Sequence, residues 1–290
     1  MKVFYHNDLD GRCAAYQVMK RFEKEEPELF EMDYNRKFPM DIIRKDEPVV
    51  IVDFSISPEE MKTLLTKTGD VTWLDHHKTA IEKYLPFPEM ETSLKGIRDT
   101  SYSGAFLAWL HYCGRPIPPD YKEVPEYIRL VNDHDTWKFI YGNRTRYFQL
   151  FMDTYYSEEW WQGFALCETE SGLEKIIEHG KEIFNYQKLK NRKEAEQLSF
   201  PVLFEGHRFL AINKPGNSSI LEDLFDPEKH DAFMCITMQP DKRFKVSLYT
   251  NKNIDLAVIA QKHGGGGHKQ ACRFYTDDIY SITGTPEKKN

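Results

Sequence analysis

The sequence feature that most restricts the fold is a pair of short apolar segments on either side of a helical segment. Residues 49–52 read Val-Val-Ile-Val and residues 71–74 read Val-Thr-Trp-Leu, which is typical of strands buried on both faces of a sheet. Between them, Ser57 and Pro58 mark the start of a helix, with Ser57 as its N-cap. A strand–helix–strand succession joins parallel strands, so the sequence predicts a parallel sheet with helices on both faces.

The same alternation begins at the N-terminus. Residues 2–5 form a predicted strand, followed by a loop at 6–11 and a helix from Arg12 to about Glu25. Residues 100–104 introduce an apolar helix at 105–112, whose first turn offers hydroxyl groups and free backbone N–H groups. The N-terminal part of the chain is therefore predicted to be one α/β domain.

A long amphipathic helix is predicted at residues 171–199, where Leu173, Ile176 and Ile177 begin an apolar stripe at helical spacing. Short strands with turn signals between them are expected at 202–204, 208–212, 232–238 and 244–249. We therefore expect an α/β protein with a parallel-sheet N-terminal domain (1–170), a linker helix (171–199) and a smaller α/β C-terminal domain (200–290), and a cleft between the two domains.

Composition excludes several classes of protein. The longest apolar run has six residues, far fewer than the roughly 20 that a membrane-spanning helix needs. The N-terminus lacks the pattern of a secretory signal. Five cysteines without close spacing make neither a disulfide framework nor a thiolate zinc site. We expect a cytoplasmic protein with no membrane partner.

The charge distribution favours a short anionic ligand over a long nucleic acid. The chain has 39 basic and 46 acidic residues, a net charge of −7, which argues against binding along a long duplex. Residues 242–273 nevertheless contain seven basic residues and one acidic residue, Asp255. Such a compact basic segment suits a small anion, although a solvated face without function has the same composition.

Side chains able to bind metal ions follow each of the predicted N-terminal strands. Because the carboxyl ends of parallel strands lie at one edge of a sheet, these side chains are expected to converge there. The candidates are His6, Asp8 and Asp10 after the first strand, Asp53 after strand 49–52, Asp75, His76 and His77 after strand 71–74, and Asp133, His134 and Asp135 after a helical segment.

Converging carboxylates repel one another unless cations lie between them. Carboxylate and imidazole ligands without thiolate favour Mn²⁺, with Mg²⁺, Co²⁺ or Zn²⁺ as competitors. The number of candidate ligands exceeds what one tetrahedral ion takes, so we expect two divalent ions. Each cluster alone is also compatible with a helix cap, a turn or an incidental histidine pair; four clusters at successive element ends favour the metal hypothesis.

The sequence resembles the DHH phosphoesterase superfamily, which includes RecJ-like exonucleases, nano-RNases, cyclic-dinucleotide phosphodiesterases and family II pyrophosphatases. The resemblance covers nearly the whole chain and rests on five motifs in order. These are Asp8 and Asp10, then Asp53, then the name-giving Asp75-His76-His77, then Asp133 within residues 132–135, and finally Gly265-Gly266-Gly267-His268, which is similar to the signature of the DHH-associated C-terminal domain.

Carried over by position, the resemblance implies two metal sites. One ion would be held by His6 and Asp8. The other would be held by Asp10 and His76, and Asp53 would bridge the two ions. The chemistry that the resemblance implies is hydrolysis of a phosphate ester by a water that the two ions would share.

The resemblance also implies roles for residues around these ligands. Asp133 would complete the second metal site, with Asp135 as a substitute. His77 would face the substrate, as a phosphate-binding group or as the acid for the leaving oxygen. Asp75 would orient this region rather than bind metal directly.

The glycine run has a physical interpretation of its own. Gly265, Gly266 and Gly267 allow the backbone to approach an anion closely, and His268 adds a side-chain donor, so we expect substrate binding here. A flexible turn is the alternative. The strand at 245–250 departs from the family pattern, because Tyr249 stands where an arginine is often found; an aromatic ring there stacks on bases instead of pairing with phosphate.

These observations predict a metal-dependent phosphodiesterase that hydrolyses dinucleotides and other very short oligonucleotides to nucleoside 5′-monophosphates. The alternatives are a nucleoside 3′,5′-bisphosphate phosphatase, a cyclic-dinucleotide phosphodiesterase and, outside the enzymes, a nucleotide-binding regulatory module. A pyrophosphatase is disfavoured because that branch has a different C-terminal domain. Two divalent ions, Mn²⁺ first and Mg²⁺ or Co²⁺ next, are the expected cofactors. A homodimer is compatible with the sequence.

Overall fold

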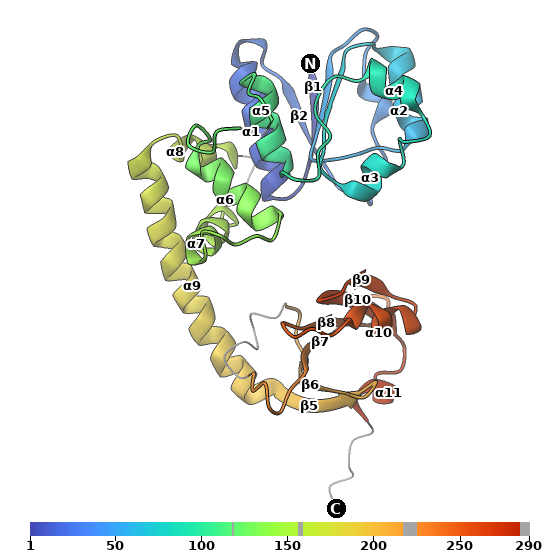
Figure 1. Ribbon diagram of the computed structural model, residues 1–290, viewed down its shortest axis with the longest axis vertical. Helices are drawn as coiled ribbons and strands as arrows, with labels where there is room; N and C mark the ends of the chain where they lie inside the picture. The colour runs from blue at the N-terminus through green and yellow to red at the C-terminus, as the bar shows by residue number, and fades with distance from the viewer. Residues whose placement is uncertain (118, 156–158, 217–224, 285–290) are drawn as a thin grey trace, which may run out of the picture. The chain divides into compact units, whose positions relative to one another are not determined.

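The computed structural model describes residues 1–117, 119–155, 159–216 and 225–284. The chain divides into two compact units, Met1–Phe184 and Asn185–Asn290 (Figure 1). The domain limits expected from the sequence remain a prediction. No helix within the described ranges combines the length and the apolar character required to cross a membrane.

The N-terminal unit is built on a four-stranded parallel sheet. Its strands, in the order β2-β1-β3-β4, are β2 (Glu28–Met32), β1 (Lys2–His6), β3 (Val49–Val52) and β4 (Val71–Leu74). Tyr5 of β1 is level with Val52 of β3, which is level with Leu74 of β4. Every residue of β3 and β4 is buried, as their apolar sequences predicted. The chain segments that follow β1, β3 and β4 therefore leave the sheet at the same edge.

Helices cover both faces of this sheet (Figure 1). Val50 and Val52 point into a core formed with α1, α5 and α6, whereas Ile51 and Trp73 point into a second core that includes α2 and α4. The helices are α1 (Leu9–Arg21), η1 (Glu23–Glu25), η2 (Met40–Ile42), α2 (Pro58–Lys67), α3 (Lys78–Glu82), α4 (Pro88–Ser93), α5 (Gly104–Tyr112), α6 (Glu126–Asp135), α7 (Asn143–Met152) and α8 (Trp161–Leu166).

Local capping determines where the helices near the sheet edge begin. Ser57 caps α2 in a reciprocal capping box with Glu60, and Pro58 occupies the first helical position, as predicted. Helix α1 begins at Leu9 rather than at Arg12, because the Asp8 carboxylate accepts a hydrogen bond from Gly11 N and acts as N-cap. The earlier start places Asp10 in the first turn of α1.

A long helix, α9 (Glu170–Leu198), crosses the boundary between the two units, in agreement with the predicted linker helix. It is followed by a six-stranded mixed sheet in the order β5-β6-β7-β8-β10-β9. Its elements are β5 (Ser199–Phe204), β6 (His207–Ile212), β7 (Ala232–Met238), β8 (Phe244–Tyr249), α10 (Leu256–Lys262), β9 (Gly266–His268), β10 (Ala271–Thr276) and α11 (Tyr280–Thr283).

The C-terminal sheet has two different faces. Val246, Leu248 and Phe274 point toward α10 and α11 and form a core with them. Lys245 and Arg273 alternate with these residues and therefore lie on the other face. The expected fold class, an α/β protein with an N-terminal parallel sheet and a second, smaller α/β part, is confirmed.

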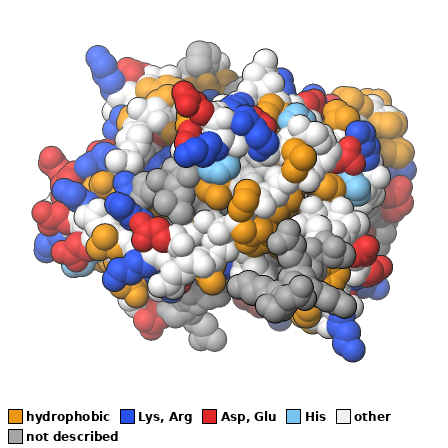
Figure 2. Space-filling model, turned by 90° about the horizontal axis from the view of Figure 1, so that it is seen from below, with side chains coloured by type: hydrophobic (Ala, Val, Ile, Leu, Met, Phe, Trp, Pro, Cys, Tyr) orange, Lys and Arg blue, Asp and Glu red, His pale blue; other side chains and the backbone are white. Residues whose placement is uncertain are grey.

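On the surface shown in Figure 2, basic and acidic side chains are intermixed.

Candidate metal centre

The edge of the N-terminal sheet gathers most of the ligands that the sequence predicted. His6 ends β1, and Asp8 and Asp10 begin α1. Asp53 follows β3, and His76 and His77 follow β4. Asp135, at the end of α6, joins them from the neighbouring helical layer. Three groups of these residues have ligand atoms within 4.8 Å of one another: His6, Asp8 and Asp53; Asp10, His76 and Asp135; and Asp53, His76 and His77.

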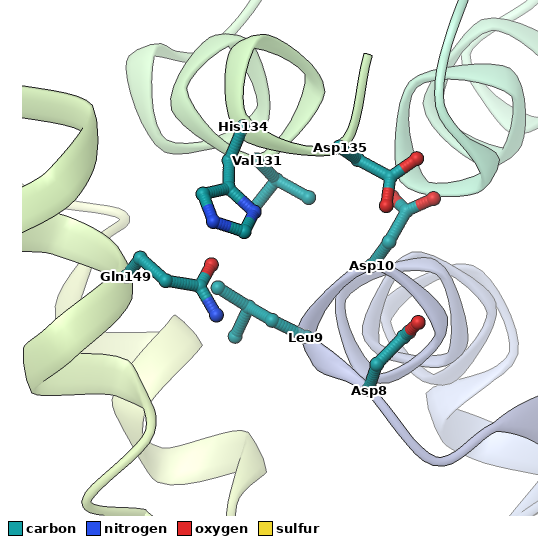
Figure 3. A pocket seen from close by; sticks show the side chains of 7 residues that line it. All are labelled: Asp8, Leu9, Asp10, Val131, His134, Asp135 and Gln149. Carbon is teal, nitrogen blue, oxygen red and sulfur yellow. The ribbon is translucent and has the colours of Figure 1, made fainter. Parts of the chain in front are cut away.

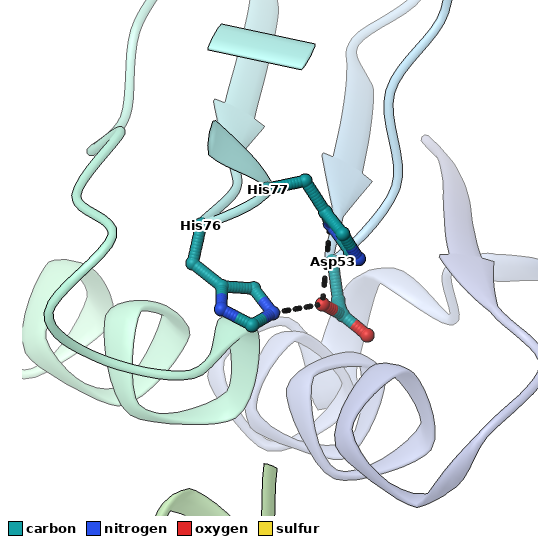
Figure 4. Close-up of side chains that lie close together, drawn as sticks. All are labelled: Asp53, His76 and His77. Carbon is teal, nitrogen blue, oxygen red and sulfur yellow. Dashed lines mark ion pairs between the residues drawn. The ribbon is translucent and has the colours of Figure 1, made fainter. Parts of the chain in front are cut away.

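Asp53 is the centre of this cluster. Its side chain is only 1% exposed, and neither carboxylate oxygen accepts a hydrogen bond from the described residues. His76 Nε2 lies 3.1 Å and His77 Nδ1 lies 4.0 Å from one oxygen, Oδ1 (Figure 4). His6 Nδ1 lies 3.9 Å from the other oxygen, Oδ2. Burial and the negative charges of Asp10, Asp8, Asp135 and Asp75 raise the pKa of Asp53 far above its usual value.

The backbone around Asp53 is also unusual. Asp53 has a φ of 51°, a left-handed conformation that is uncommon for a residue with a side chain. Gly104, at the start of α5, packs directly against it, because a Cβ at position 104 would lie 2.4 Å from the Asp53 Cβ. A strained backbone and a buried carboxylate that accepts no hydrogen bond from the described residues are, at the same residue, typical of a functional position.

The first group combines His6 with Asp8. His6 Nδ1 lies 2.7 Å from Asp8 Oδ2, while Asp8 Oδ1 accepts the N-cap hydrogen bond from Gly11 N. Burial opposes ionisation of Asp8, but the hydrogen bond and the charge of His6 lower the pKa of Asp8 below its usual value. An anionic Asp8 with one imidazole and one Asp53 oxygen provides the oxygen and nitrogen ligands that a divalent ion such as Mn²⁺ accepts.

The second group combines Asp10, His76 and Asp135. His76 Nε2 lies 3.6 Å from Asp10 Oδ2 and 3.2 Å from Asp135 Oδ2. Burial and the charges of Asp10 and Asp8 raise the pKa of Asp135 to about 8. Asp10 is fixed by two hydrogen bonds, from Gly104 N at 2.6 Å and Ala105 N at 2.9 Å. The first N–H groups of α5, which were expected from the sequence to be free, therefore orient the Asp10 carboxylate.

Asp75 and His77 form a separate pair beside the ligands. Asp75 is fully buried, and its Oδ1 accepts hydrogen bonds from the backbone N–H groups of His76 and His77. The same oxygen lies 2.7 Å from His77 Nδ1. Although burial favours a neutral imidazole, the hydrogen bond and charge of Asp75 hold the pKa of His77 above its usual value. This geometry suits the orienting role expected for Asp75.

Asp133, expected from the sequence to complete the second metal site, is not among the groups of possible ligands that the described residues form. Its carboxylate accepts hydrogen bonds from Ile140 N, Tyr141 N and the Thr145 hydroxyl. Both of its oxygens therefore hold the chain between α6 and α7. Asp135, the substitute named from the sequence, lies at the cluster instead. The two residues differ because Asp133 points into the interior of the unit and Asp135 toward the sheet edge.

A small pocket opens beside the cluster (Figure 3). It holds about 80 Å³ and is lined by Asp8, Leu9, Asp10, Val131, His134, Asp135 and Gln149, enough for a few water molecules. Burial lowers the pKa of His134, against the opposing charges of Asp8 and Asp10. Gln149 was not foreseen from the sequence, because it comes from α7, a helix without any metal-ligand motif.

The glycine run of the C-terminal unit forms part of a larger pocket of about 530 Å³. Gly266 begins the edge strand β9, which pairs with β10. A Cβ at Gly265 would lie 2.1 Å from Arg273 O, whereas one at Gly266 would meet open space. Of the predicted binding residues, Gly265, Gly266 and Gly267 line the pocket; His268 pairs with Ala271 through the backbone. The other lining residues are Lys245, Ser247, Tyr249, Gly264, Ala271, Cys272, Arg273 and Tyr275.

The structure was compared with known proteins. No protein-family model matches the chain. An uncharacterized protein of Acanthamoeba polyphaga mimivirus is 25% identical over 234 residues, a match that covers 78% of this chain and 52% of that protein. The chain thus spans about half the length of this relative.

Solved structures are more informative about the fold. The DHH domain of a member of the s1p family of ribosomal proteins matches with a TM-score of 0.61 at 14% identity, over 96% of this chain and 83% of that one. The chain has a DHH-type fold. The pGpG-specific phosphodiesterase PggH of Vibrio cholerae also shares the DHH-type fold, with a TM-score of 0.56 at 12% identity, over 97% of this chain and 94% of that one. The resemblance predicted from the motifs is thereby confirmed for the architecture of both units.

Proposed function

We propose that this protein is a metal-dependent phosphodiesterase that hydrolyses dinucleotides and other very short oligonucleotides to nucleoside 5′-monophosphates. The observation that carries this proposal is the buried carboxylate of Asp53, which has no hydrogen-bond donor among the described residues and lies between two groups of imidazole and carboxylate ligands. A buried carboxylate in such surroundings takes up a proton unless a cation compensates its charge. Oxygen and nitrogen ligands without thiolate favour Mn²⁺, with Mg²⁺ or Co²⁺ as alternatives.

The proposed ligand sets follow the two groups. His6 and Asp8 would hold one ion, Asp10, His76 and Asp135 would hold the other, and Asp53 would be a ligand shared by both. When bound, the two ions neutralise the phosphoryl oxygens and lower the pKa of a water molecule so that it can attack phosphorus near neutral pH. Asp10 is already oriented for this role by its two hydrogen bonds from the first turn of α5.

His77 is the proposed acid for the leaving oxygen. Hydrolysis forms a bond between the water oxygen and phosphorus and breaks the bond between phosphorus and the ribose 3′ oxygen. The 3′ oxygen then takes a proton from His77 Nε2, while the proton of the attacking water passes to solvent. Asp75 Oδ1 lies 2.7 Å from His77 Nδ1, which leaves Nε2 for the substrate, and its hydrogen bond and charge raise the pKa of His77, which favours the protonated form that an acid needs.

The pocket of the C-terminal unit is the proposed binding site for the nucleotide. Lys245 and Arg273 supply positive charge, and Gly265, Gly266 and Gly267 leave room for a close approach of an anion to the backbone. Its volume of about 530 Å³ lies in the usual range for sites that bind small molecules. The side chain of His268, expected from the sequence as an additional donor, lies outside the described part of the structure. A substrate of nucleotide size also agrees with the pGpG specificity of the Vibrio cholerae protein that shares the fold.

A product time course tests the proposal. The protein is incubated with Mn²⁺ and 5′-phosphorylated RNA of two, three, five and twenty-four nucleotides, and with 3′-phosphoadenosine 5′-phosphate and a cyclic dinucleotide. We expect 5′-mononucleotides to be released fastest from the dinucleotide. Rapid degradation of the longest RNA, or preference for the bisphosphate or the cyclic dinucleotide, would contradict the proposed substrate.

A matched pair of histidine variants ties the activity to the cluster. His76→Ala removes a side chain whose ion-pair contacts lie within the cluster, so it is expected to abolish hydrolysis while the fold is retained. His179→Ala removes an exposed histidine from α9 and is expected to leave the rate unchanged. Similar rates for the two variants would refute the assignment of the metal centre.

A further inference from the structure

A half-exposed tyrosine stands next to the metal centre. Tyr34 lies in the loop after β2, and its ring centre is 5.5 Å from the ring centre of His6 and 6.2 Å from that of His77. The side chain is 53% exposed. Large aromatic side chains are mostly buried in this unit, so an exposed ring beside two predicted functional imidazoles requires an explanation.

The ring of Tyr34 is held in place from one side. It stacks on Phe54 with a centroid distance of 4.8 Å and an interplanar angle of 30°, and Phe54 itself is buried. Phe54 directly follows Asp53, so the ring packs on the same segment that carries the central carboxylate. Phe54 covers one side of the ring, the two imidazoles lie beside it, and about half of the side chain is exposed to solvent.

A rigid aromatic ring with an open face is suited to stack on a nucleobase. Stacking of this kind tolerates every base, because each base has a π face. His6 and His77 lie beside the ring, so the ring is next to the residues that would hold a phosphate at the cluster.

We propose that Tyr34 stacks on the nucleobase of the nucleotide whose phosphate lies at the metal centre. This proposal rests on the proposed function and adds a source of substrate specificity. The ring makes the enzyme prefer nucleotides to other phosphate esters. The pairing of a phosphate site with an adjacent stacking ring selects nucleotides by shape, without hydrogen bonds that read the identity of the base.

Three variants and three substrates test this inference. Tyr34→Ala removes the ring, and Tyr34→Phe keeps the ring but removes the hydroxyl group. Tyr280→Ala is the matched control, because Tyr280 on α11 is equally exposed, at 54%. The substrates are the 5′-phosphorylated diadenosine dinucleotide and two analogues that each lack one of its adenines. KM and kcat are measured with Mn²⁺, and thermal unfolding checks that each variant is folded.

We expect Tyr34→Ala to raise KM for the complete dinucleotide by about 10- to 100-fold, with a much smaller change in kcat. Tyr34→Phe and Tyr280→Ala should keep the KM of the unmodified protein. For one of the two analogues, the difference between Tyr34→Ala and the unmodified protein should disappear, since the base that stacks is missing. An equal loss on all three substrates, an equal loss in Tyr34→Phe, or no loss at all would overturn the inference.

A binding measurement separates this inference from the proposed function. If the unmodified protein hydrolyses none of the substrates, the proposed function fails. Calorimetric titration of the Mn²⁺-loaded protein with adenosine 5′-monophosphate and with ribose 5-phosphate then decides the inference. Weaker binding of the nucleotide to Tyr34→Ala, with unchanged binding of the sugar phosphate, supports base stacking. Equal changes for both ligands contradict it.

Discussion

Aspartate residues are in opposite electrostatic situations in the two units of this chain. In the N-terminal unit, Asp53 and Asp135 are surrounded by other carboxylates, and burial and repulsion raise the pKa of each. In the C-terminal unit, Asp231 lies 2.9 Å from Arg208 Nη2 and 3.3 Å from Lys252 Nζ. These hydrogen bonds and charges lower the pKa of Asp231.

The difference indicates which unit needs bound cations to balance its charges. The C-terminal unit neutralises Asp231 with its own cations, at a partly exposed site where such pairs contribute little to stability. The N-terminal unit concentrates carboxylates at the edge of its sheet and leaves the oxygens of Asp53 without donors among the described residues. We infer that this unit reaches its full stability with divalent ions bound.

The most severe test of the comparison is Asp53→Asn. The substitution keeps the shape of the side chain but removes the charge shared by the two proposed ions. Because such ions supply several kcal/mol of transition-state stabilisation, we expect hydrolysis to fall by about 10³-fold or more. In EDTA at pH 8, the same variant should be more stable than the unmodified protein, since an asparagine has neither a charge to bury nor a raised pKa that costs free energy of folding. A variant that is less stable in EDTA would contradict this account of Asp53.

The response of the metal-free protein to pH should differ between the units. All five tryptophans lie between Trp73 and Trp161, so their fluorescence during urea unfolding reports on the N-terminal unit alone. The folded-state pKa of Asp135, about 8, is above the ordinary 3.8, and that of Asp53 is raised in the same direction. At pH values between the ordinary pKa and the raised folded-state pKa of these groups, the folded state binds more protons than the unfolded state.

The metal-free N-terminal unit should therefore lose stability as the pH rises. In EDTA, the free energy of unfolding measured by tryptophan fluorescence should fall as the pH rises from about 4 to 8, and Mn²⁺ should reduce this fall. The raised pKa of His77 acts in the same direction. Asp231, whose pKa is lowered, contributes stability that is lost only as the pH falls below its ordinary 3.8. Constant stability of the metal-free unit from pH 5 to 8 would contradict the comparison.

Removal of the proposed acid should have a smaller effect than removal of Asp53. We expect His77→Ala to lower kcat about 100-fold, within the range of general acid catalysis, while the protein keeps both ions. A dinucleotide analogue with a nitrophenyl leaving group, which needs no proton, should be hydrolysed by His77→Ala at nearly the unmodified rate. An equal loss on both substrates would show that His77 acts in another way.

The smallest effect on activity is expected for Asp133→Asn. This variant disturbs the hydrogen bonds to Ile140 N, Tyr141 N and Thr145, so the free energy of unfolding should fall by about 1–3 kcal/mol. Hydrolysis at a temperature well below unfolding should stay within a few-fold of the unmodified rate. Asp135→Asn is the matched comparison, because it should lose metal binding. The reverse outcome for the two aspartates would restore Asp133 as the ligand.

The sequence predicted the fold best where local signals were strong. The β-branched run of β3, the apolar β4 and the Ser57-Pro58 start of α2 were all placed correctly from the sequence. Strand β2 was missed because its sequence, ELFEM, interrupts apolar residues with glutamates. Strands β9 and β10 were missed because glycines and charged residues obscure the alternation. Their pairing depends on β8 and on the close approach at Gly265, which only the folded unit shows.

The sequence predicted which residues gather at the candidate site, but it did not predict all of their contacts. Residues that end strands were identified because parallel strands share an edge. The choice between Asp133 and Asp135 lay beyond the sequence, because both sit in the last turn of α6 and only tertiary packing decides which one points to the edge. The use of the α5 N–H groups by Asp10 was hidden for the same reason, since 94 residues separate Asp10 from Gly104.

The number of Mn²⁺ ions bound per chain tests the central claim most directly. It can be counted by equilibrium dialysis with metal analysis, for the unmodified protein, Asp53→Asn and Asp133→Asn. The account predicts two ions for the unmodified protein, two for Asp133→Asn, and at most one for Asp53→Asn. Full binding by Asp53→Asn, or no binding by the unmodified protein, would contradict the claim that this carboxylate lies between two metal ions.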